Sequence, residues 1–491
     1  MNAQIRRFSG VMLAVFALLL GNLFYYQVVR ADAYANDNRN ARTIIKEYSI
    51  ERGRMVVGSG KDEVVVAESV PTDDALEYLR KYPEGRKYAF ITGFYSFVFG
   101  RDLAEQAFNN YLIGRAPEQF AQNLEQLLTA EAQPGGTLQL TIDPQVQAVA
   151  AEALGERKGA VVALEPTTGA VLALTSFPRY DPNPLSTHDN AQITQTWKKL
   201  TADPDQPRLN RSASQLYPPG STFKVITSAA YLADGGSPDD GLQNATSYTP
   251  PQTQRPIPNF GGGTCLGNKQ PITLKEALQV SCNTVFARLG NDLGGDKLVD
   301  MAQRFGFNEE MPYQLPAATS QIPAADKLDK PAEAQSAIGQ RDVRASPLQM
   351  ATVAATIANG GKRMAPRVVD SVRAADGSLV KKFAPEEVNQ PITSDVASQL
   401  QDMMVNVVTN GTGDRAQIPG ITVGGKTGTA QRGPGQAPHA WFIGFGSSGD
   451  RQIAVAVIVE AGGDVGSEAT GGHVSAPIAK AVIQAYLGGS S

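Results

Sequence analysis

A charge-free apolar segment near the N-terminus, residues 8–29, places the strongest limit on what this chain can fold into. A helix needs about 20 predominantly apolar residues to cross a bilayer, so the segment predicts a single transmembrane anchor. Arg6 and Arg7 precede it, and positively charged flanks stay on the cytoplasmic side of a membrane. We therefore expect residues 1–7 to form a cytoplasmic tail and everything after Arg30 to lie outside the cytoplasm.

A cleaved signal peptide is the alternative interpretation of this segment. Ala33, Tyr34 and Ala35 match the small-x-small pattern of a cleavage site. The apolar stretch is longer than the core of a signal peptide, which is about 7–15 residues, and this favours the anchor. Both interpretations export the bulk of the chain, and the anchor predicts a single-pass protein of the cell membrane.

The length of the chain limits the expected number of domains, and its charge limits the classes of partner it can bind. The chain has 491 residues, more than one hydrophobic core usually holds, so we expect about two to four domains. Its formal net charge is −4, and the only charged residues before position 31 are Arg6, Arg7 and Arg30. The exported part is therefore more acidic than the whole, which argues against a nucleic-acid partner.

A break near residue 136 divides the exported part. Residues 116–132 have the apolar periodicity of an amphipathic helix. The residues on its apolar face are Phe120, Leu124, Leu127 and Leu128. Gln-Pro-Gly-Gly at 133–136 ends this pattern. We expect a smaller membrane-proximal module over residues 30–136 and a larger domain over 137–491.

The larger domain shows an α+β pattern. Two apolar runs flank the turn at 166–169, and two more flank the turn at 447–450, so each pair predicts a β-hairpin. Most of the sequence between the hairpins is helical, including residues 348–358, and a last helix is expected over 475–487. We expect an antiparallel sheet built from both ends of the domain, with a helical insertion between them.

Several kinds of catalytic site are poorly supported by the sequence. It contains no H-E-x-x-H, no Cys-x-x-Cys and no G-x-S-x-G pattern. The three histidines, His188, His439 and His473, are widely spaced. A lone histidine beside a strand is more often structural than catalytic, and we interpret His439 in this way. We expect neither a metal nor a cofactor.

Two cysteines, Cys265 and Cys282, are separated by a short stretch of chain. In an oxidising compartment such a pair can form one disulfide. Two unpaired buried thiols are the alternative that the sequence leaves open.

Ser221 and Lys224 are candidates for a nucleophile and its base. A Pro-Pro-Gly precedes Ser221 and a helical apolar run follows it, so the serine is expected at a helix N-terminus, where free N–H groups favour developing negative charge. Positions three apart share a helix face, so the Lys224 amine can reach the Ser221 hydroxyl. A lysine is a useful base only if burial or a nearby cation lowers its pKa. The S-x-x-K pattern alone also occurs by chance.

A second hydroxyl follows about sixty residues later. Thr273 and Glu276 form a capping-box pattern at the start of a short helix that leads to Ser281, Cys282 and Asn283. The Ser281 hydroxyl is suited to relaying a proton, and the Asn283 carboxamide to hydrogen-bonding a lysine and a substrate. S-x-N alone carries little information.

A third element, Lys426-Thr427-Gly428-Thr429, ends an alternating apolar run and is expected on a strand. A cation and hydroxyls on an edge strand can hold a substrate carboxylate, and a glycine lets the backbone approach closely. The Thr429 N–H can point at a reacting carbonyl. A plain turn between strands is the alternative for K-T-G by itself.

The set S-x-x-K, S-x-N and K-T-G occurs together in serine β-lactamases and penicillin-binding proteins. From about residue 137 to its end, the chain resembles the transpeptidase domain of class B penicillin-binding proteins, and with its short N-terminal module it is most similar to the actinobacterial PbpA type. Cys282 stands where class A β-lactamases have Asp. Four further stretches carry the resemblance: YPPGSTFK at 217–224, NRS at 210–212, AIGQRDVRASPLQMA at 337–351 and TIANGG at 356–361.

The resemblance implies a fold and a division of the chain. The expected fold is an α+β serine transpeptidase domain, in which helices flank an antiparallel sheet beside an all-helical subdomain. It is expected over residues 137–491. The anchor at 8–29 and a non-catalytic pedestal or dimerisation module at 30–136 precede it.

The resemblance also implies a role for each motif residue. Ser221 would attack the penultimate D-Ala carbonyl of a peptidoglycan stem peptide, and Lys224 would accept its proton. Ser281 would relay that proton to the leaving amine, and Asn283 would order Lys224 and contact the substrate amide. β-Lactams would mimic the D-Ala-D-Ala substrate and stall the reaction at the acyl-enzyme.

The third motif would bind the end of the substrate. Lys426, Thr427 and Thr429 would hold the terminal carboxylate, with Gly428 allowing close approach. Backbone N–H groups of Ser221 and Thr429 would form the oxyanion hole. Lys426 would also keep the other lysine of the site neutral by like-charge repulsion.

Other functions of the same chemistry remain as alternatives. Residues 30–136 are too few for a glycosyltransferase domain, and no E-x-x-L-N pattern supports a β-lactamase. A β-lactam-acylated sensor, or mainly a scaffold of the cell-wall synthesis machinery, is the alternative function. Family analogy implies a SEDS-type membrane glycosyltransferase as a partner.

Overall fold

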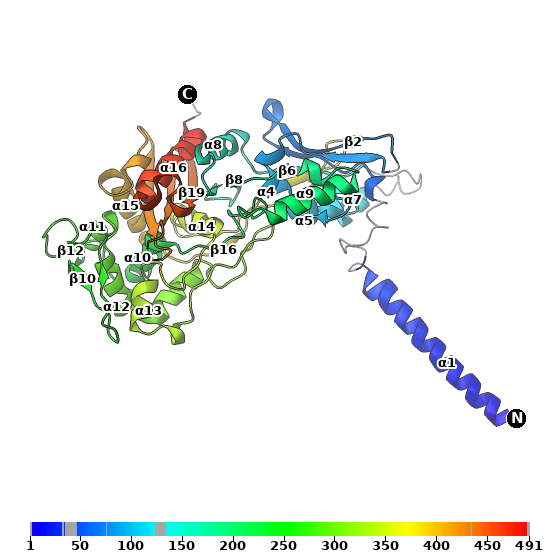
Figure 1. Cartoon of the computed structure of the whole chain (residues 1–491), viewed down its shortest axis with the longest axis horizontal. Helices are drawn as coiled ribbons and strands as arrows, with labels where there is room; N and C mark the ends of the chain where they lie inside the picture. Colours follow the sequence, from blue (N-terminus) through cyan, green and yellow to red (C-terminus); the bar gives the residue numbers. More distant parts are fainter. Residues whose placement is uncertain are drawn as a thin grey trace.

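The N-terminal helix stands apart from the rest of the chain. The computed structural model describes residues 2–31, 34, 47–74, 76–122, 134–433 and 435–488. Helix α1 (Asn2–Phe24) continues into the π-helical turn η1 (Tyr25–Val29), and its side chains are exposed (Figure 1). Within the described ranges, Gln4–Val29 is the one helix long and apolar enough to cross a membrane, judged by length and composition. The cleavage-site residues Ala33 and Ala35 lie outside the described residues.

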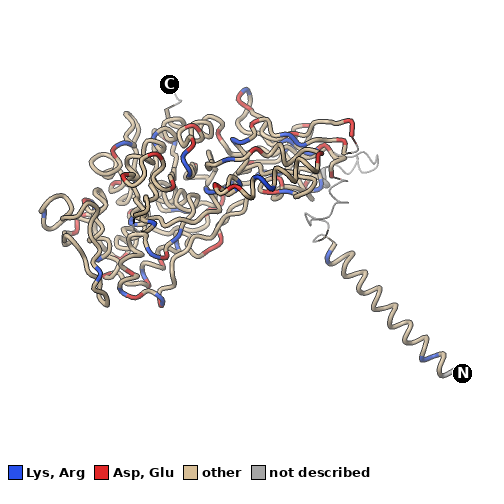
Figure 2. The backbone as a smooth tube through the Cα atoms, viewed as in Figure 1, with Lys and Arg blue, Asp and Glu red and all other residues tan. Residues whose placement is uncertain are grey.

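Charge is distributed differently over the anchor and the folded regions. Figure 2 shows basic and acidic residues interspersed along both folded regions, whereas α1 carries charge only near its ends. A mixed surface of this kind is typical of a protein that stays in water, and an uncharged helix of this length fits a bilayer. The anchor expected from the sequence is therefore consistent with the structure.

A six-stranded sheet joins the N-terminal module to the larger domain. Its strand order is β15-β14-β6-β1-β2-β3. Strand β6 pairs in parallel with β1 and antiparallel with β14, so it lies between strands from both regions. The strands are β1 (Met55–Val57), β2 (Val64–Pro71), β3 (Tyr78–Lys81), β6 (Thr137–Leu140), β14 (Val369–Arg373) and β15 (Leu379–Lys382).

Short helices complete the module. They are α4 (Ala89–Thr92), α5 (Leu103–Ala107), α6 (Asn109–Leu112) and α7 (Pro117–Gln122), with 3₁₀ turns η2 (Gly60–Asp62) and η3 (Gly85–Lys87) and a hairpin of β4 (Tyr95–Ser96) and β5 (Gly100–Arg101). Helix α7 covers the first part of the helix expected at 116–132. Leu124, Leu127 and Leu128 lie outside the described residues, and so does the side chain of Phe120.

A cluster of charged side chains is buried inside the module. Glu105 accepts hydrogen bonds from Arg52 Nε at 2.5 Å, from Arg80 Nε at 2.7 Å and from the Tyr82 hydroxyl at 3.1 Å. Asn109 Oδ1 accepts from Arg52 Nη1 at 2.6 Å. Burial opposes ionisation of Glu105, but Arg80 and Arg52 outweigh it and lower the pKa of this carboxyl. The cluster therefore stays ionised.

The larger domain is built on a five-stranded antiparallel sheet, in the order β17-β18-β19-β7-β8. The expected hairpins form β7 with β8 and β18 with β19, and the pairing of β19 with β7 joins the two ends of the domain. This confirms the α+β sheet predicted from the sequence. The strands are β7 (Gly159–Leu164), β8 (Val171–Phe177), β17 (Thr422–Ala430), β18 (His439–Ser448) and β19 (Arg451–Val459).

Helices cover both faces of this sheet. Helices α8 (Pro144–Leu154) and α16 (Gly471–Leu487) pack together on one face, although they come from opposite ends of the domain (Figure 1). Helix α14 (Pro347–Ala358) contacts β18, β19 and β7, and all of its residues are buried. The Ser346 side chain caps α14, as Asp143 caps α8, and a proline follows each cap.

The remaining helices form the insertion between the hairpins, as expected. They are α9 (Asn190–Ala202), α10 (Lys224–Ala233), α11 (Leu274–Gln279), α12 (Asn283–Arg304), α13 (Lys330–Ser336) and α15 (Ser394–Asn410). Short strand pairs are β9 (Gly241–Leu242) with β12 (Ile272–Thr273), β10 (Ser247–Tyr248) with β11 (Ile257–Pro258), and β13 (Arg363–Met364) with β16 (Glu387–Asn389). The 3₁₀ turns are η5 (Asn183–Leu185), η6 (Gly220–Phe223), η7 (Ala325–Lys327), η8 (Asp414–Ala416) and η9 (Glu460–Glu468).

Candidate active site

Ser221 lies in the 3₁₀ turn η6, which leads directly into α10. Neither helix start has a side-chain cap, so the N–H groups around Ser221 are not occupied by a capping side chain. Gly220 has φ of 54°, and a Cβ there would come within 3.1 Å of the Ala430 backbone on β17. Glycine at this position therefore lets the serine turn press against the strand that carries the third motif.

Lys224 is completely buried and is held by the second motif. Its Nζ donates hydrogen bonds to the Ser281 carbonyl and to Asn283 Oδ1, both at 2.7 Å, and lies 3.3 Å from Ser281 Oγ. Over the described ranges, the Lys224 amine makes no hydrogen bond to Ser221. The structure thus brings Lys224, Ser281 and Asn283 together across nearly sixty residues of sequence.

The electrostatic environment favours a neutral Lys224. Burial, followed by the charge of Lys426, lowers the pKa of Lys224 well below its usual value. A neutral amine has two N–H donors and one lone pair. The Ser281 carbonyl and Asn283 Oδ1 can only accept, so they use both donors and leave the lone pair for a hydroxyl proton.

Ser281 adopts an unusual backbone conformation between α11 and α12. Its φ is 61°, a left-handed conformation that costs a residue other than glycine on the order of 1–3 kcal/mol. The turn is supported from both sides, because a capping box of Thr273 and Glu276 starts α11 and Asn283 opens α12. This strained turn directs both the carbonyl and the hydroxyl of Ser281 to the lysine.

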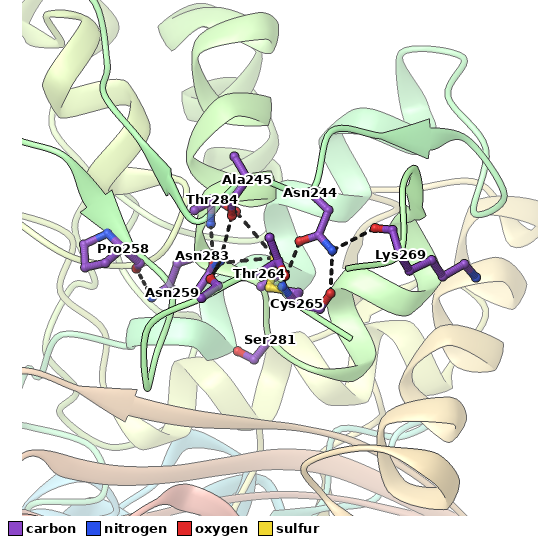
Figure 3. The surroundings of a disulfide bond; sticks show 12 residues. Asn244, Ala245, Pro258, Asn259, Thr264, Cys265, Lys269, Ser281, Asn283 and Thr284 are labelled. Carbon is purple, nitrogen blue, oxygen red and sulfur yellow. Dashed lines mark hydrogen bonds between the residues drawn. A yellow bond between two sulfur atoms is a disulfide. The ribbon is translucent and has the colours of Figure 1, made fainter. Parts of the chain in front are cut away.

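A disulfide between Cys265 and Cys282 ties the middle residue of the second motif to a neighbouring loop. In Figure 3 the side chains of Asn244 and Asn259 flank the disulfide, and Ser281 and Asn283 lie beside it. Asn244 Oδ1 accepts from the Cys265 N–H at 2.8 Å, and Asn283 Nδ2 donates to the Pro258 carbonyl at 3.1 Å. The loop therefore braces the start of α12.

The third motif lies on β17, an edge strand of the five-stranded sheet. Lys426 is completely buried, its Nζ donates to the Thr427 carbonyl at 2.8 Å, and burial lowers its pKa to about 7. A Cβ on Gly428 would lie 2.9 Å from Thr222 Cγ2 and 3.0 Å from Trp441 Cβ, so only glycine fits between them. Strand β17 and the serine turn are therefore in close contact.

One cavity of about 840 Å³ brings the motif residues together. The buried lysines, Lys224 and Lys426, are not among the residues that line it. The candidate residues that line it are Ser221, Ser281, Asn283, Thr427 and Thr429. A serine hydroxyl that lines the cavity near a buried neutral amine, beside hydroxyls on an edge strand, can carry out nucleophilic attack on a carbonyl compound that ends in a carboxylate.

Some residues of the cavity were not found by sequence reasoning. Thr412 shares a 2.6 Å hydrogen bond between its Oγ1 and that of Thr427. Gln340, Thr470 and His473 also line the cavity. Gln340 lies in the 337–351 stretch that carries the family resemblance, which could have pointed to it. Thr412 and the start of α16, with Thr470 and His473, belong to no motif, so only the fold places them at the site.

His439 has a structural environment. It is buried at the start of β18, and its Nδ1 accepts a hydrogen bond from the Ala461 N–H at 3.3 Å. Burial, followed by the charge of Arg432, lowers the pKa of His439 to about 4, so the imidazole is neutral. Among the residues that the structure describes, no group of three His, Cys, Asp or Glu is placed to hold a metal ion.

The sequence from 420 to 427, GITVGGKT, also matches the letters of a phosphate-binding P-loop, G-x-x-x-x-G-K-[ST]. A P-loop is a turn between a strand and a helix, whose N–H groups surround the phosphate. Here most of the segment belongs to β17 and pairs with β18 along its length. Its backbone is committed to the sheet, so the match is a coincidence of letters.

Comparison with known proteins agrees with this geometry. Residues 159–484 match the family described as "Penicillin binding protein transpeptidase domain", and residues 52–138 match "Penicillin binding protein A dimerisation domain". The chain is similar to peptidoglycan D,D-transpeptidase PbpA of Mycolicibacterium smegmatis, with 42% identity over 99% of both chains. It is 39% identical to PbpA of Mycobacterium tuberculosis H37Rv over the full length of both.

A solved structure extends the similarity to the fold. Penicillin-binding protein A from M. tuberculosis, as its ceftriaxone acyl-enzyme complex, superposes with a TM-score of 0.85 at 39% identity, covering 90% of this chain and all of that one. The fold class and the family expected from the sequence are thereby confirmed. The chain belongs to the penicillin-binding proteins, as a class B member of the PbpA type.

Proposed function

We propose that this chain is a peptidoglycan D,D-transpeptidase that cross-links stem peptides through an acyl-enzyme on Ser221. The observation that carries the proposal is the convergence of three motifs on one cavity, with a buried and neutral lysine behind the serine turn. Its membership of a family whose relatives bear this name supports the same reaction.

Acylation begins with attack on the penultimate D-Ala carbonyl of a donor stem peptide. The lone pair of Lys224 takes the Ser221 proton as the Ser221 Oγ–carbon bond forms. The carbonyl oxygen becomes an oxyanion, which the backbone N–H groups of Ser221 and Thr429 stabilise. Each such donor contributes about 10²–10³ in rate. Close contact between the serine turn and β17 supports a shared role for these two N–H groups.

The same proton then leaves with the terminal D-Ala. Ser281 Oγ lies 3.3 Å from Lys224 Nζ, so the hydroxyl can pass a proton from the lysine to the leaving amine. Asn283 holds Lys224 through its Oδ1. Collapse of the tetrahedral intermediate breaks the peptide bond and leaves the donor as an ester on Ser221.

The carboxylate of the leaving D-Ala is bound by the third motif. Thr427 and Thr429 line the cavity and offer hydroxyl groups. The Lys426 side chain, on β17 itself, is buried. When Lys426 is protonated, its charge attracts the carboxylate and repels a proton from Lys224. Gly428 keeps the strand close to the serine turn.

An amine from a second stem peptide completes the reaction. It attacks the ester carbonyl, the Ser221–carbonyl bond breaks, and a new peptide cross-link forms. A β-lactam enters the first half of this sequence as a substrate mimic and leaves Ser221 acylated. The acyl-enzyme complex that the similar M. tuberculosis protein forms with ceftriaxone supports this behaviour.

The setting at the membrane is part of the proposal. Residues 1–7 would be cytoplasmic, 8–29 would span the membrane, and 30–136 and 137–491 would lie outside as the non-catalytic module and the transpeptidase domain. The arginines before the anchor and the disulfide outside it support this orientation. We also propose a SEDS-type membrane glycosyltransferase as a partner, because residues 30–136 are too few to supply that activity in this chain.

A labelled penicillin tests the reaction on the detergent-solubilised full chain. We expect a slowly hydrolysed adduct that Ser221→Ala abolishes. Ser228→Ala is the matched control, because Ser228 is a buried serine on α10 whose hydroxyl has no partner among the described residues, and it should acylate normally. Rapid release of the label would indicate a β-lactamase, and no adduct on the unmodified chain would leave the scaffold alternative.

A further inference from the structure

The chain segment just before Ser221 has few ways to hold its own position. Pro218 and Pro219 have no N–H to donate, and the serine turn has no side-chain cap. The Pro218 carbonyl accepts a hydrogen bond from Trp441 Nε1 at 3.0 Å, and the Gly220 N–H donates to the Gly339 carbonyl at 2.9 Å. The Thr222 hydroxyl donates to the Pro219 carbonyl at 2.8 Å, and further support comes from the residue before the prolines, Tyr217.

Tyr217 is a buried side chain that links this segment to β18 and to Glu460, the residue that follows β19. Its backbone N–H and carbonyl both pair with Ala345. Its ring packs edge-on against His439 and Trp441, both on β18, with centroids 5.3 and 6.0 Å away. Its hydroxyl donates to Glu460 Oε1 at 2.7 Å. The tyrosine is therefore fixed at its backbone, its ring and its hydroxyl.

The carboxylate that Tyr217 reaches is itself oriented. Glu460 is the first residue after β19, and its Oε1 also accepts from Arg211 Nε at 2.9 Å. The other Arg211 nitrogens donate to the carbonyls of Gln206 and Asp205 at 3.1 and 2.8 Å. Arg211 is 2% exposed, so the ion pair is shielded on that side. This ion pair gives a structural role to Arg211, the middle residue of the N-R-S stretch at 210–212, which the catalytic chemistry does not use.

The position of this network relates it to the chemistry. Strand β18 pairs with β17 at every residue from Lys426 to Thr429. The Tyr217 ring packs against Trp441 on β18, and Ser221 follows Tyr217 by four residues in the chain. The Tyr217–Glu460 bond thus helps to set where the Ser221 N–H lies relative to the Thr429 N–H. Displacement of a reacting group by about 1 Å can lower a rate by about 10²-fold.

We propose that Tyr217, through its hydrogen bond to Glu460, is a positioning residue that sets the geometry of the Ser221 oxyanion hole. The inference rests on the proposed acylation of Ser221. It assigns Tyr217 no contact with the substrate, because neither Tyr217 nor Glu460 lines the cavity. Its loss should slow the acylation step and leave binding of the ligand before acylation unchanged.

The chain contains a matched control for the substitution. Tyr82 is also a buried tyrosine that donates to a glutamate, at 3.1 Å from Glu105 Oε1, but it lies in the N-terminal module. Tyr217→Phe and Tyr82→Phe each remove one hydroxyl and one hydrogen bond of the same kind. A merely structural role predicts the same behaviour from both variants.

Stopped-flow acylation of the full chain by a fluorescent penicillin, normalised to active sites, tests the proposal. We expect Tyr217→Phe to lower the acylation rate constant by about tenfold to a hundredfold, with the dissociation constant of the first complex within about twofold of the unmodified chain. Tyr82→Phe should acylate at the unmodified rate. Glu460→Ala also removes the ion pair with Arg211, so it should slow acylation at least as much as Tyr217→Phe. The double variant should be no slower than Glu460→Ala alone, because the Tyr217–Glu460 bond is already lost in that variant.

Three results would overturn the proposal. They are an unmodified rate constant in Tyr217→Phe, a slowing shared by Tyr82→Phe, and an effect confined to the dissociation constant. Acylation of the unmodified chain and its loss in Ser221→Ala establish the proposed function separately. Failure of the positioning role is therefore distinguishable from failure of the function.

Discussion

The N-terminal module and the active site both bury side chains that carry a charge in water. In the module, Glu105 lies between Arg52 and Arg80, and the pKa of Glu105 is lowered while that of Arg52 is raised. In the active site, Lys224 and Lys426 are buried with the same sign of charge, and the pKa of each is lowered. Burial opposes the charged form in both places: in the module the neighbouring arginines outweigh it, whereas at the two lysines it prevails, and at Lys224 the charge of Lys426 adds to it.

The difference separates two uses of buried polar groups. Opposite charges compensate for lost hydration, so the module cluster stays ionised and joins several segments. Like charges add to the effect of lost hydration, so a lysine gives up its proton. The first arrangement holds a structure together, and the second prepares a base.

Removal of the base should give the largest effect. Lys224→Met keeps the apolar stem and removes the amine, so we expect the acylation rate constant to fall about 10²–10⁴-fold, the usual contribution of a general base. The measurement is the rate of adduct formation with a labelled penicillin. Because the variant also leaves the Ser281 carbonyl and Asn283 Oδ1 without their donor, thermal unfolding is used to verify that it is folded under the assay conditions. An unmodified acylation rate constant in the folded variant would contradict the comparison.

Breaking the buried cluster of the module should lower the stability of the chain and leave the acylation rate constant unchanged. Glu105→Gln leaves Arg52 and Arg80 buried without their anion, so we expect a loss of about 3–5 kcal/mol in the free energy of unfolding. Urea unfolding measures this loss. The acylation rate constant per active site should stay at the unmodified value, and a slower rate would show that the module cluster also supports the site.

Stability should rise with pH at both clusters but in different pH windows, because the pKa of Lys426 and that of Glu105 are both lowered in the folded chain. Lys426 has a pKa of about 7 in the folded chain against 10.5 normally, so the unfolded chain binds more protons and stability rises with pH through this window. The slope from one such group is about 1.4 kcal/mol per pH unit, and Lys426→Met should lose it. Glu105 has a lowered pKa, so its contribution is present above the usual 4.5 and is lost as pH falls through its folded value.

Urea unfolding across pH checks both parts of this prediction. An alkaline slope that is unchanged in Lys426→Met would show that Lys426 is protonated in the folded chain. If Glu105→Gln lost stability at acid pH as steeply as the unmodified chain, Glu105 would not be the group that titrates there.

The smallest effect is expected from an aromatic ring beside the base. Lys224 Nζ lies 5.5 Å from the centre of the Phe286 ring, whose face favours a cation. Phe286→Leu should therefore lower the pKa of Lys224 further and move the acidic midpoint of the acylation rate down by about half a pH unit. The pH–rate profile with labelled penicillin measures this shift, and an upward shift would contradict it.

The parts of the fold that local patterns encode could be predicted from the sequence. The turns at 166–169 and 447–450 predicted the two hairpins, and Asp143 and Ser346, each followed by a proline, cap the helices α8 and α14. These features depend on neighbouring residues only. At 420–427 a sequence match to the P-loop pattern would predict the wrong structure, because most of this segment forms strand β17.

Features that depend on long-range packing could not be predicted in this way. The bonds from Lys224 to Ser281 and Asn283 and the hydroxyl pair of Thr412 and Thr427 join segments that are distant in sequence. Family resemblance predicted that the motifs would meet. It also predicted the contact of Asn283 with Lys224, but not the bond from Lys224 to the Ser281 carbonyl, because that bond depends on the left-handed turn at Ser281.

Strand β6 has a consequence for anyone who shortens the chain. It begins at Thr137 and pairs on one side with β1 and on the other with β14. A protein that starts at residue 137 would expose the β1 side of this strand as an open edge, ready to pair with another molecule. A soluble catalytic fragment should therefore keep residues 52–136, so that the sheet ends where it does in the whole protein.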